Sequence, residues 1–257
     1  MSRVKFLSFM ILMRCFLLDS SKKRKIFIYV LIGLVVLFAL WFAFNIFTHI
    51  RRGIDTNETV RQAEIIDGIF NFEENVVQAA RYIMGNDDIV AHLAVPGTSI
   101  SYAVVQTIDN EFYLDHDLLR RPNSNGSIFL DYLNSPYFTD KSTIIYGHNR
   151  SDGTMLYDIQ LFMDYEFFWN NEHMIVTTDS GELVYEIFVI FATHINFNYI
   201  QVDFADEHEF LSLVYQMKDR ATHLRDIEIS GEDRILILST CTNIGPTGRL
   251  VLVGRLI

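Results

Sequence analysis

The chain has 257 residues, half of them hydrophobic, which is enough for one sizeable domain and an appendage. Its formal net charge is −11 and is unevenly distributed: residues 1–54 hold nine Lys and Arg against one Asp, a net of +8, so residues 55–257 carry −19. A body this acidic argues against nucleic acid as a partner, because phosphate binding requires clustered Lys and Arg.

An uncharged apolar run at residues 26–47 is long enough, at 22 residues, to cross a bilayer as a helix. Four basic residues at 22–25 precede it and Arg51 and Arg52 follow it. The heavier positive flank predicts that residues 1–25 are cytoplasmic and that the body lies outside the cell, as a single-pass protein of the cell membrane. A signal peptide is the alternative, but the run is longer than usual and no small-x-small cleavage site follows it.

Residues 48–84 are expected to form a linker and N-terminal helices that lift the body off the membrane. Apolar residues recur at helical intervals over 55–84. Asp55 and Glu58 have the spacing of a capping box at a helix start. Gly68 and Asn71 mark the place where this stretch would divide into two helices.

From residue 85 the pattern changes to short strands separated by turn residues, and 85–257 is expected to be one β-rich domain. Two stretches, 154–169 and 206–220, instead carry apolar residues at helical spacing and predict packing helices. So many short strands predict a barrel or a sandwich. The predicted strands are 89–95, 99–106, 111–114, 127–131, 142–146, 173–178, 183–193, 234–240 and 249–256.

Cys241 is the only cysteine outside the N-terminal 15 residues. The other, Cys15, lies across the predicted membrane span, so no disulfide is expected. No zinc-ligand spacing is present, and we expect neither a metal nor a cofactor. Cys241 ends an apolar run and lies eight residues before Arg249, which opens the next predicted strand. A sulfur nucleophile beside a fixed positive charge suits acyl-transfer chemistry.

His148 is the histidine with the most informative context. It directly follows the predicted strand 142–146, and Gly147 before it permits a close backbone approach. A Cys–His pair needs adjacency in space and not in sequence. Taken singly, His148, Cys241 and Arg249 each fit a structural role better. Together, at strand ends of an outward-facing domain with one thiol, they favour a catalytic site.

The motifs around these residues resemble those of a known family. Thr143–Asn149, Leu238–Cys241 and Arg249–Val253 look like the His, Cys and Arg motifs of sortases. The extended run from Tyr146 to Leu156 is similar to class B sortases in particular. Further similarity to class B lies in Val95–Gln106, Gly126–Tyr132 and the two helical regions 55–84 and 206–220.

The resemblance implies a fold and a chemistry. The fold is mainly β, a closed barrel of roughly eight strands with N-terminal helices and a helix before the Cys strand. Cys241 would attack a sorting-signal peptide carbonyl to form a thioacyl intermediate, and His148 would protonate the leaving amine and deprotonate the incoming one. Arg249 would donate hydrogen bonds to the oxyanion or orient the substrate. The partners would be surface proteins bearing a sorting signal and an amine of peptidoglycan or of its lipid-linked precursor.

Several points stay open at this level. Ser239 matches a substrate-contacting position, and strand alternation places it on the face of Cys241. Some class B members have an acidic residue soon after the cysteine, whereas Thr242 and Asn243 stand here. His116 and Asp117 are expected on a solvated loop, with a loop near the substrate groove as the alternative. The signal expected by resemblance is of the Asn-Pro-x-Thr or Pro-x-Thr kind.

Three other functions compete with wall anchoring. A sortase of this kind could polymerise pilins through a lysine amine. A cysteine peptidase would only hydrolyse, but in papain-like enzymes the Cys precedes the His, and here the order is reversed. A membrane-tethered binding module would keep Cys241 as a buried structural residue.

Overall fold

The computed structural model describes residues 20–70, 76–241 and 247–257, and the chain divides into two compact units, 1–53 and 54–257. Most of the predicted cytoplasmic segment, and the positions Thr242 and Asn243, therefore lie outside the described residues. In the described part, one helix is long and apolar enough to cross a membrane, within Phe27–Gly68. It belongs to α2 (Ser20–Phe70), and the large apolar side chains from Phe27 to Ile54 are exposed. An N-terminal membrane anchor is compatible with this helix.

The second unit contains the end of α2 and all the other elements. They are α3 (Val76–Met84), β1 (Ile89–Ala94), β2 (Ser101–Val105), η1 (Phe112–Leu114), β3 (Ile128–Leu130), β4 (Ser142–Tyr146), η2 (Tyr157–Met163), α4 (Tyr165–Asn170), β5 (His173–Thr178), β6 (Gly181–His194), α5 (Glu207–Lys218), β7 (His223–Leu224), β8 (Ile235–Cys241) and β9 (Gly248–Leu256).

Eight of these strands close into a barrel. The sheet order is β5-β1-β2-β3-β4-β8-β9-β6-β7, and an additional pairing of β5 with β6 closes the ring, leaving β7 as an extra strand on β6. Every barrel strand contributes buried side chains to one interior cluster, among them Leu93, Val104, Ile128, Ile145, Val176, Ile187, Leu238 and Leu252. The predicted closed barrel of roughly eight strands is confirmed.

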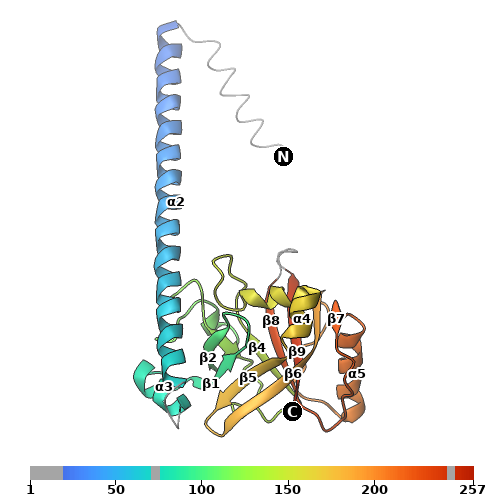
Figure 1. The fold of residues 1–257 in the computed structure, drawn as a ribbon. Helices are drawn as coiled ribbons and strands as arrows, with labels where there is room; N and C mark the ends of the chain where they lie inside the picture. Colours follow the sequence, from blue (N-terminus) through green and yellow to red (C-terminus); the bar gives the residue numbers. More distant parts are fainter. Residues whose placement is uncertain (1–19, 71–75, 242–246) are drawn as a thin grey trace. The chain divides into compact units, whose positions relative to one another are not determined.

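Helices cover the barrel from outside, as Figure 1 shows for α5 beside β6 and β7. The apolar side of α5, including Phe210 and Met217, packs on the outward-facing side chains of β4, β8 and β9. A separate cluster joins α3 and the end of α2 to β1, β2 and η1, with Val77 and Ala80 fully buried. The division of 55–84 into two helices and the helix over 206–220 are thus confirmed.

The predicted strand at 111–114 is wrong, because this stretch forms the 3₁₀ helix η1. The Asp109 carboxylate accepts hydrogen bonds from the backbone N–H groups of Glu111 and Phe112, at 2.9 and 3.0 Å. Such side-chain capping offers the backbone an alternative to a sheet ladder. The Phe112 ring then stacks on His116, with centroids 4.1 Å apart.

The single helix predicted over 154–169 is also wrong, since Asp164 divides it. This residue has extended backbone angles, φ −81° and ψ 134°, and its side chain accepts from the Phe167 N–H at 2.9 Å. An aspartate in that conformation is an N-cap, so η2 ends before it and α4 starts after it. The short strand β7 was not predicted, because two residues carry no periodic signal.

The capping box at Asp55 is wrong because α2 begins far upstream, so no unpaired backbone N–H groups exist at that point. The Asp55 carboxylate instead accepts from the N–H and hydroxyl of Ser124, at 3.1 and 2.7 Å.

The interpretation of Asp117 as a residue of a solvated loop is also wrong. Its side chain is buried and accepts from Gln62 and Arg121. Both acids belong to tertiary contacts between α2 and the barrel.

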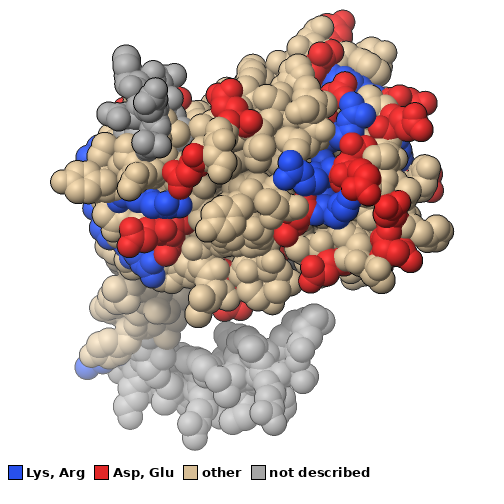
Figure 2. Space-filling view, turned by 90° about the horizontal axis from the view of Figure 1, so that it is seen from below, with Lys and Arg blue, Asp and Glu red and all other residues tan. Residues whose placement is uncertain are grey.

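On the face of the molecule shown in Figure 2, Lys and Arg side chains lie among Asp and Glu side chains, with a broad uncharged area between such regions. Ion pairs of the described residues include Arg255 with Glu186 at 2.7 Å and Arg81 with Asp179 at 3.1 Å. Many cations of this acidic body therefore face carboxylates. Such partly exposed pairs are screened by salt and contribute little to stability.

His92 gives the fold a predictable response to acid. Burial lowers its pKa to about 4, although the Asp67 carboxylate acts in the opposite direction. In the unfolded chain the pKa of a histidine is about 6.5. Between pH 6.5 and 4 the unfolded state therefore binds a proton that the folded state does not. The stability that neutral, buried His92 contributes to the fold is thus complete above pH 6.5 and is lost as the pH falls below it.

We expect the free energy of unfolding to drop by about 2 kcal/mol more in the native chain than in His92→Gln between pH 7.5 and 5. Glutamine keeps a neutral polar group beside Ser101, the partner of His92 at 3.0 Å. Denaturant titrations of the two full-length proteins in micelles, at both pH values, measure the difference. Equal pH dependence would show that His92 is not the group responsible.

Candidate active site

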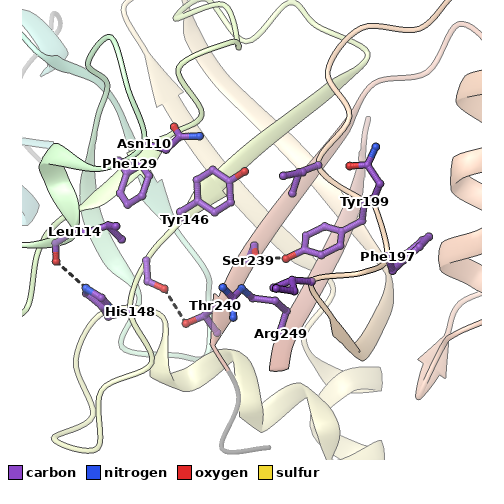
Figure 3. A pocket seen from close by; sticks show the side chains of 14 residues that line it. Asn110, Leu114, Phe129, Tyr146, His148, Phe197, Tyr199, Ser239, Thr240 and Arg249 are labelled. Carbon is purple, nitrogen blue, oxygen red and sulfur yellow. Dashed lines mark hydrogen bonds between the residues drawn. The ribbon is translucent and has the colours of Figure 1, made fainter. Parts of the chain in front are cut away.

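The ends of three neighbouring strands bring the predicted site residues together. β8 runs parallel to β4, with Tyr146 opposite Ser239, and antiparallel to β9, with Cys241 opposite Arg249. His148 lies two residues beyond the end of β4. The Thr240 hydroxyl donates to the Gly147 carbonyl at 2.7 Å and fixes the backbone just before His148 (Figure 3). All three predicted positions therefore lie at one edge of the barrel.

Strand alternation assigns a face to these positions. On β8, Leu236 and Leu238 point into the barrel, whereas Ile235 and Ile237 belong to the outer cluster under α5. Positions 239 and 241 continue the outer series. On β9 the outer series is Val253, Val251 and then Arg249. The side chain of Cys241 lies outside the described residues, but its register position is on the face that carries Arg249.

His148 is oriented by a backbone carbonyl. Its Nε2 lies 2.7 Å from the Leu114 carbonyl oxygen at the end of η1, an interaction drawn in Figure 3. A carbonyl oxygen only accepts hydrogen bonds, so Nε2 carries the hydrogen in this contact. In the neutral ring Nδ1 is then the basic nitrogen. The imidazole is partly exposed, so it remains accessible from the solvent side.

Arg249 is held close to its own strand. Its Nη1 donates to the Gly248 carbonyl at 2.9 Å, and the side chain is only partly exposed. Its charge also reaches Tyr146. Burial raises the pKa of the Tyr146 phenol, Asp131 raises it further, and Arg249 acts to lower it. A guanidinium and a protonated phenol thus both lie along the same pocket.

A pocket of about 280 Å³ opens at this edge (Figure 3). One part of its wall is apolar and the other part is polar, an arrangement suited to a peptide with both kinds of group. The apolar lining comes from Leu114, Phe129, Ile195, Phe197 and Ile200. The remaining lining comes from Asn110, Tyr146, Gly147, His148, Asn198, Tyr199, Ser239, Thr240 and Arg249.

Ser239 lies on the pocket wall and is almost fully buried. Its Oγ lies 2.7 Å from the hydroxyl of Tyr199, and either oxygen could be the donor (Figure 3). Tyr199 comes from the segment between β6 and α5 and belongs to the outer cluster. The sequence pattern gave no signal for Tyr199, because a tyrosine in an irregular segment has no periodicity to place it.

Asp131 binds two residues of the pocket wall and was not among the predicted site residues. This buried carboxylate accepts from the Tyr146 hydroxyl at 2.8 Å and from the Asn110 amide at 2.9 Å through the same oxygen. Its other oxygen accepts from the Leu133 N–H at 2.9 Å. An aspartate directly after an apolar strand is a signal that sequence analysis could have used.

The comparisons with known proteins agree with this geometry. The family described as "Sortase domain" matches residues 93–257. Sortase B of Listeria monocytogenes is 36% identical over 176 residues, covering 67% of this chain and 71% of that protein. Sortase B of Staphylococcus aureus is 31% identical with the same coverage.

Solved structures give the same result. A Bacillus anthracis sortase B in complex with AAEK1 is similar with a TM-score of 0.72 and 28% identity, covering 79% of this chain and 98% of that one. A Staphylococcus aureus sortase B–substrate complex has a TM-score of 0.69 and 26% identity, covering 79% and 94%. The chain therefore belongs to the sortase family, a family of cysteine transpeptidases. Since these relatives are sortase B proteins, the resemblance to class B is confirmed.

Gly147 tests how tightly the site is packed. A Cβ atom there would lie 2.4 Å from Ile128 Cδ1 and 2.8 Å from Leu156 Cγ, closer than packed atoms approach. We expect Gly147→Ala to lower the free energy of unfolding by about 1–3 kcal/mol. The displaced backbone carries His148, so turnover should fall as well.

Thermal unfolding and peptide cleavage by the full chain in micelles measure both effects. Gly68→Ala is the matched control, because no atom beyond the local helix backbone lies within 4 Å of a Cβ at that helical position. A Gly147→Ala protein as stable and as active as Gly68→Ala would contradict the packing argument.

Proposed function

We propose that this sortase cleaves a C-terminal sorting signal of surface proteins and transfers the acyl group to a peptidoglycan amine. Cys241 Sγ attacks the scissile carbonyl carbon, the C–N bond breaks, and a thioester forms. An amine then attacks the thioester carbon, a new amide bond forms, and the thiolate leaves. The observation that carries the proposal is the register of β8, which sets Cys241 opposite Arg249 beside the strand end that bears His148.

His148 is the proton carrier in both halves of the reaction. Because Nε2 donates to the Leu114 carbonyl, Nδ1 is the atom that exchanges protons with the substrate. It takes the thiol proton of Cys241 and gives it to the departing amine; it then takes a proton from the incoming amine and returns it to the released sulfur, so the ring ends in its initial neutral state. The Leu114 carbonyl thus has the orienting role that a third residue has in other nucleophile–base pairs.

Arg249 stabilises the negative charge that develops on the carbonyl oxygen. Its guanidinium is on the partner position of Cys241 and borders the pocket. A charged donor in a partly buried position interacts more strongly with an oxyanion than it would in water. We also assign to Ser239 and Tyr199 contacts with the peptide backbone of the signal, which is supported by their paired hydroxyls on the same pocket wall.

The same proposal includes a membrane topology for the chain. Residues 26–47 anchor the enzyme, residues 1–25 are cytoplasmic, residues 48–84 connect, and residues 85–257 act outside the cell. The positive flank before the apolar run supports this orientation. A membrane-anchored enzyme at the outer surface meets both exported proteins and lipid-linked wall precursors, which supplies the two substrates.

The direct test combines the full chain in micelles with a library of quenched sorting-signal peptides, with and without an added amine. Transfer to hydroxylamine or to a cross-bridge peptide, in preference to hydrolysis, supports the transpeptidase. Cleavage that yields only the free acid at every amine concentration supports a hydrolytic peptidase. No cleavage of any peptide, together with a thiol that resists alkylation, supports a binding module.

The nucleophile is tested by removing the thiol. Cys241→Ala should abolish cleavage and transfer, and Cys241→Ser should nearly do so, because a hydroxyl without strong base activation is a far weaker nucleophile. Mass spectrometry should detect an acyl adduct in the native chain and none in the alanine variant. Cys15→Ala, the only other thiol change available, should leave both activities intact. Residual turnover in Cys241→Ala would disprove the covalent role.

The oxyanion role is tested by Arg249→Lys. Lysine keeps the charge but not the planar fork of donors, so kcat/KM should fall by about 10²-fold. Arg255→Lys, six residues further along β9 and paired with Glu186, is the matched control and should stay near native activity. Near-native turnover in Arg249→Lys would rule out a directional oxyanion contact.

A further inference from the structure

One face of α2 is held by polar contacts. Asp55, Thr59 and Gln62 follow one another at helical spacing, and all three are buried at 7, 5 and 3% exposure. Thr56 and Glu58, between Asp55 and Thr59 in the sequence, are partly exposed. We call these five residues the polar stripe of α2. A helix that only had to adhere to the barrel would bury apolar side chains there, because unpaired polar groups are costly to bury.

The polar stripe holds the loop 115–127, which follows η1. Asp55 accepts two hydrogen bonds from Ser124. Gln62 donates to the Asp117 carboxylate at 3.0 Å and accepts from the Leu118 N–H at 3.1 Å. Glu58 accepts from Arg121 at 2.6 Å, and Thr59 accepts from Asn125 at 3.2 Å. The loop is therefore fixed to α2 at several points along its length.

The same stripe holds a second loop, 147–156, which contains His148. The Thr56 hydroxyl donates to Asp152 at 2.9 Å. Burial would raise the pKa of Asp152, but hydrogen bonds from Thr154 and Thr56 outweigh it and leave this pKa lowered. Arg150 binds the same carboxylate at 3.1 Å and reaches the Ser124 carbonyl at 3.4 Å. The two loops are thus joined to each other and to α2.

His148, near the start of the second loop, is hydrogen-bonded next to the start of the first loop and to the end of its own. Its Nε2 is bound to the Leu114 carbonyl, next to the start of the first loop, at 2.7 Å. Its own carbonyl accepts from the Leu156 N–H at 3.0 Å, at the end of the second. The backbone just after Leu114 is itself held in place, since the Asn123 N–H donates to the Asp115 carbonyl at 2.8 Å. A shift of either loop would move the imidazole or its orienting carbonyl.

We propose that the polar stripe of α2 positions His148, through Thr56–Asp152 on one side and Asp55–Ser124 on the other. The helix that also contains the apolar anchor is in this way a positioning element of the active site. This inference rests on the proposed acid–base role of His148. A misplacement of about 1 Å at a catalytic group costs turnover far more than it costs substrate binding.

The test uses the full chain in micelles and the variant Thr56→Val with Ser124→Ala. Valine matches the shape of threonine, and each change removes one hydroxyl from the stripe contacts. The control is Thr48→Val, on the same helix, whose hydroxyl donates to the Asn45 carbonyl of α2 itself. We expect kcat for amine transfer to fall about tenfold in the double variant, with KM within twofold of native, and no change in the control.

A spectroscopic readout separates positioning from stability. In ¹⁵N-histidine-labelled protein the native His148 ring should be the Nε2–H tautomer, and the double variant should show the Nδ1–H tautomer in part. The signal is assigned by its loss in His148→Gln. Unchanged kcat and an unchanged tautomer in a folded double variant would overturn the inference. So would a loss of kcat that follows the unfolded fraction, measured by thermal melting at the assay temperature.

The single variant Thr56→Val keeps the test valid if the double variant folds poorly, because Thr56 is partly exposed and needs no repacking. It should show a smaller fall in kcat with the same tautomer change. The inference and the proposed function fail separately. Full activity in His148→Gln would remove the acid–base role itself. Loss of activity in His148→Gln with native kcat in Thr56→Val would overturn only the positioning role.

Discussion

The pairing of β8 with two strands of opposite direction is the constraint on which the site depends. The parallel ladder with β4 brings the end of one strand beside the end of another, and the antiparallel ladder with β9 brings a strand start to the same place. A slip of one residue in either ladder would turn Cys241 toward the barrel interior and leave Arg249 opposite another position. The two-sided burial of β8, with leucines inside and isoleucines under α5, makes such a slip costly.

The local part of this arrangement could be predicted from the sequence. The bounds of β4 and β5 match the predicted strands, and the other barrel strands differ from them by few residues, because alternation and turn residues are local signals. His148, Cys241 and Arg249 could be placed at strand ends for the same reason. Their proximity in space could not be derived from periodicity, because His148 and Cys241 are 93 residues apart. Strand pairing across that distance gives no signal in the local sequence. The family resemblance supplied that step.

Two of the errors share one physical cause, the competition between side chains and the backbone for hydrogen bonds. Asp109 and Asp164 each accept from backbone N–H groups and so convert an apolar run into a 3₁₀ turn or a helix start. Asp55 has the spacing of a cap but binds a distant loop, since its helix begins far upstream, at Ser20. Asp131 and Tyr199 were missed because their partners lie on other elements. An acid can have any of these roles, and only the fold decides between them.

The two N-terminal helices of the body divide adhesion and orientation between them. α3 packs apolar side chains such as Val77 and Ala80 against the barrel, and such contacts resist separation but tolerate sliding. The polar stripe of α2 adds hydrogen bonds, which depend steeply on distance and angle and are costly to leave unmade in a buried place. Apolar packing therefore attaches the helices, whereas the buried polar contacts select one position of α2 against the loops beside His148. The proposed acid–base role of His148 requires the second kind of contact, and the polar stripe supplies it on the face of α2 that reaches those loops.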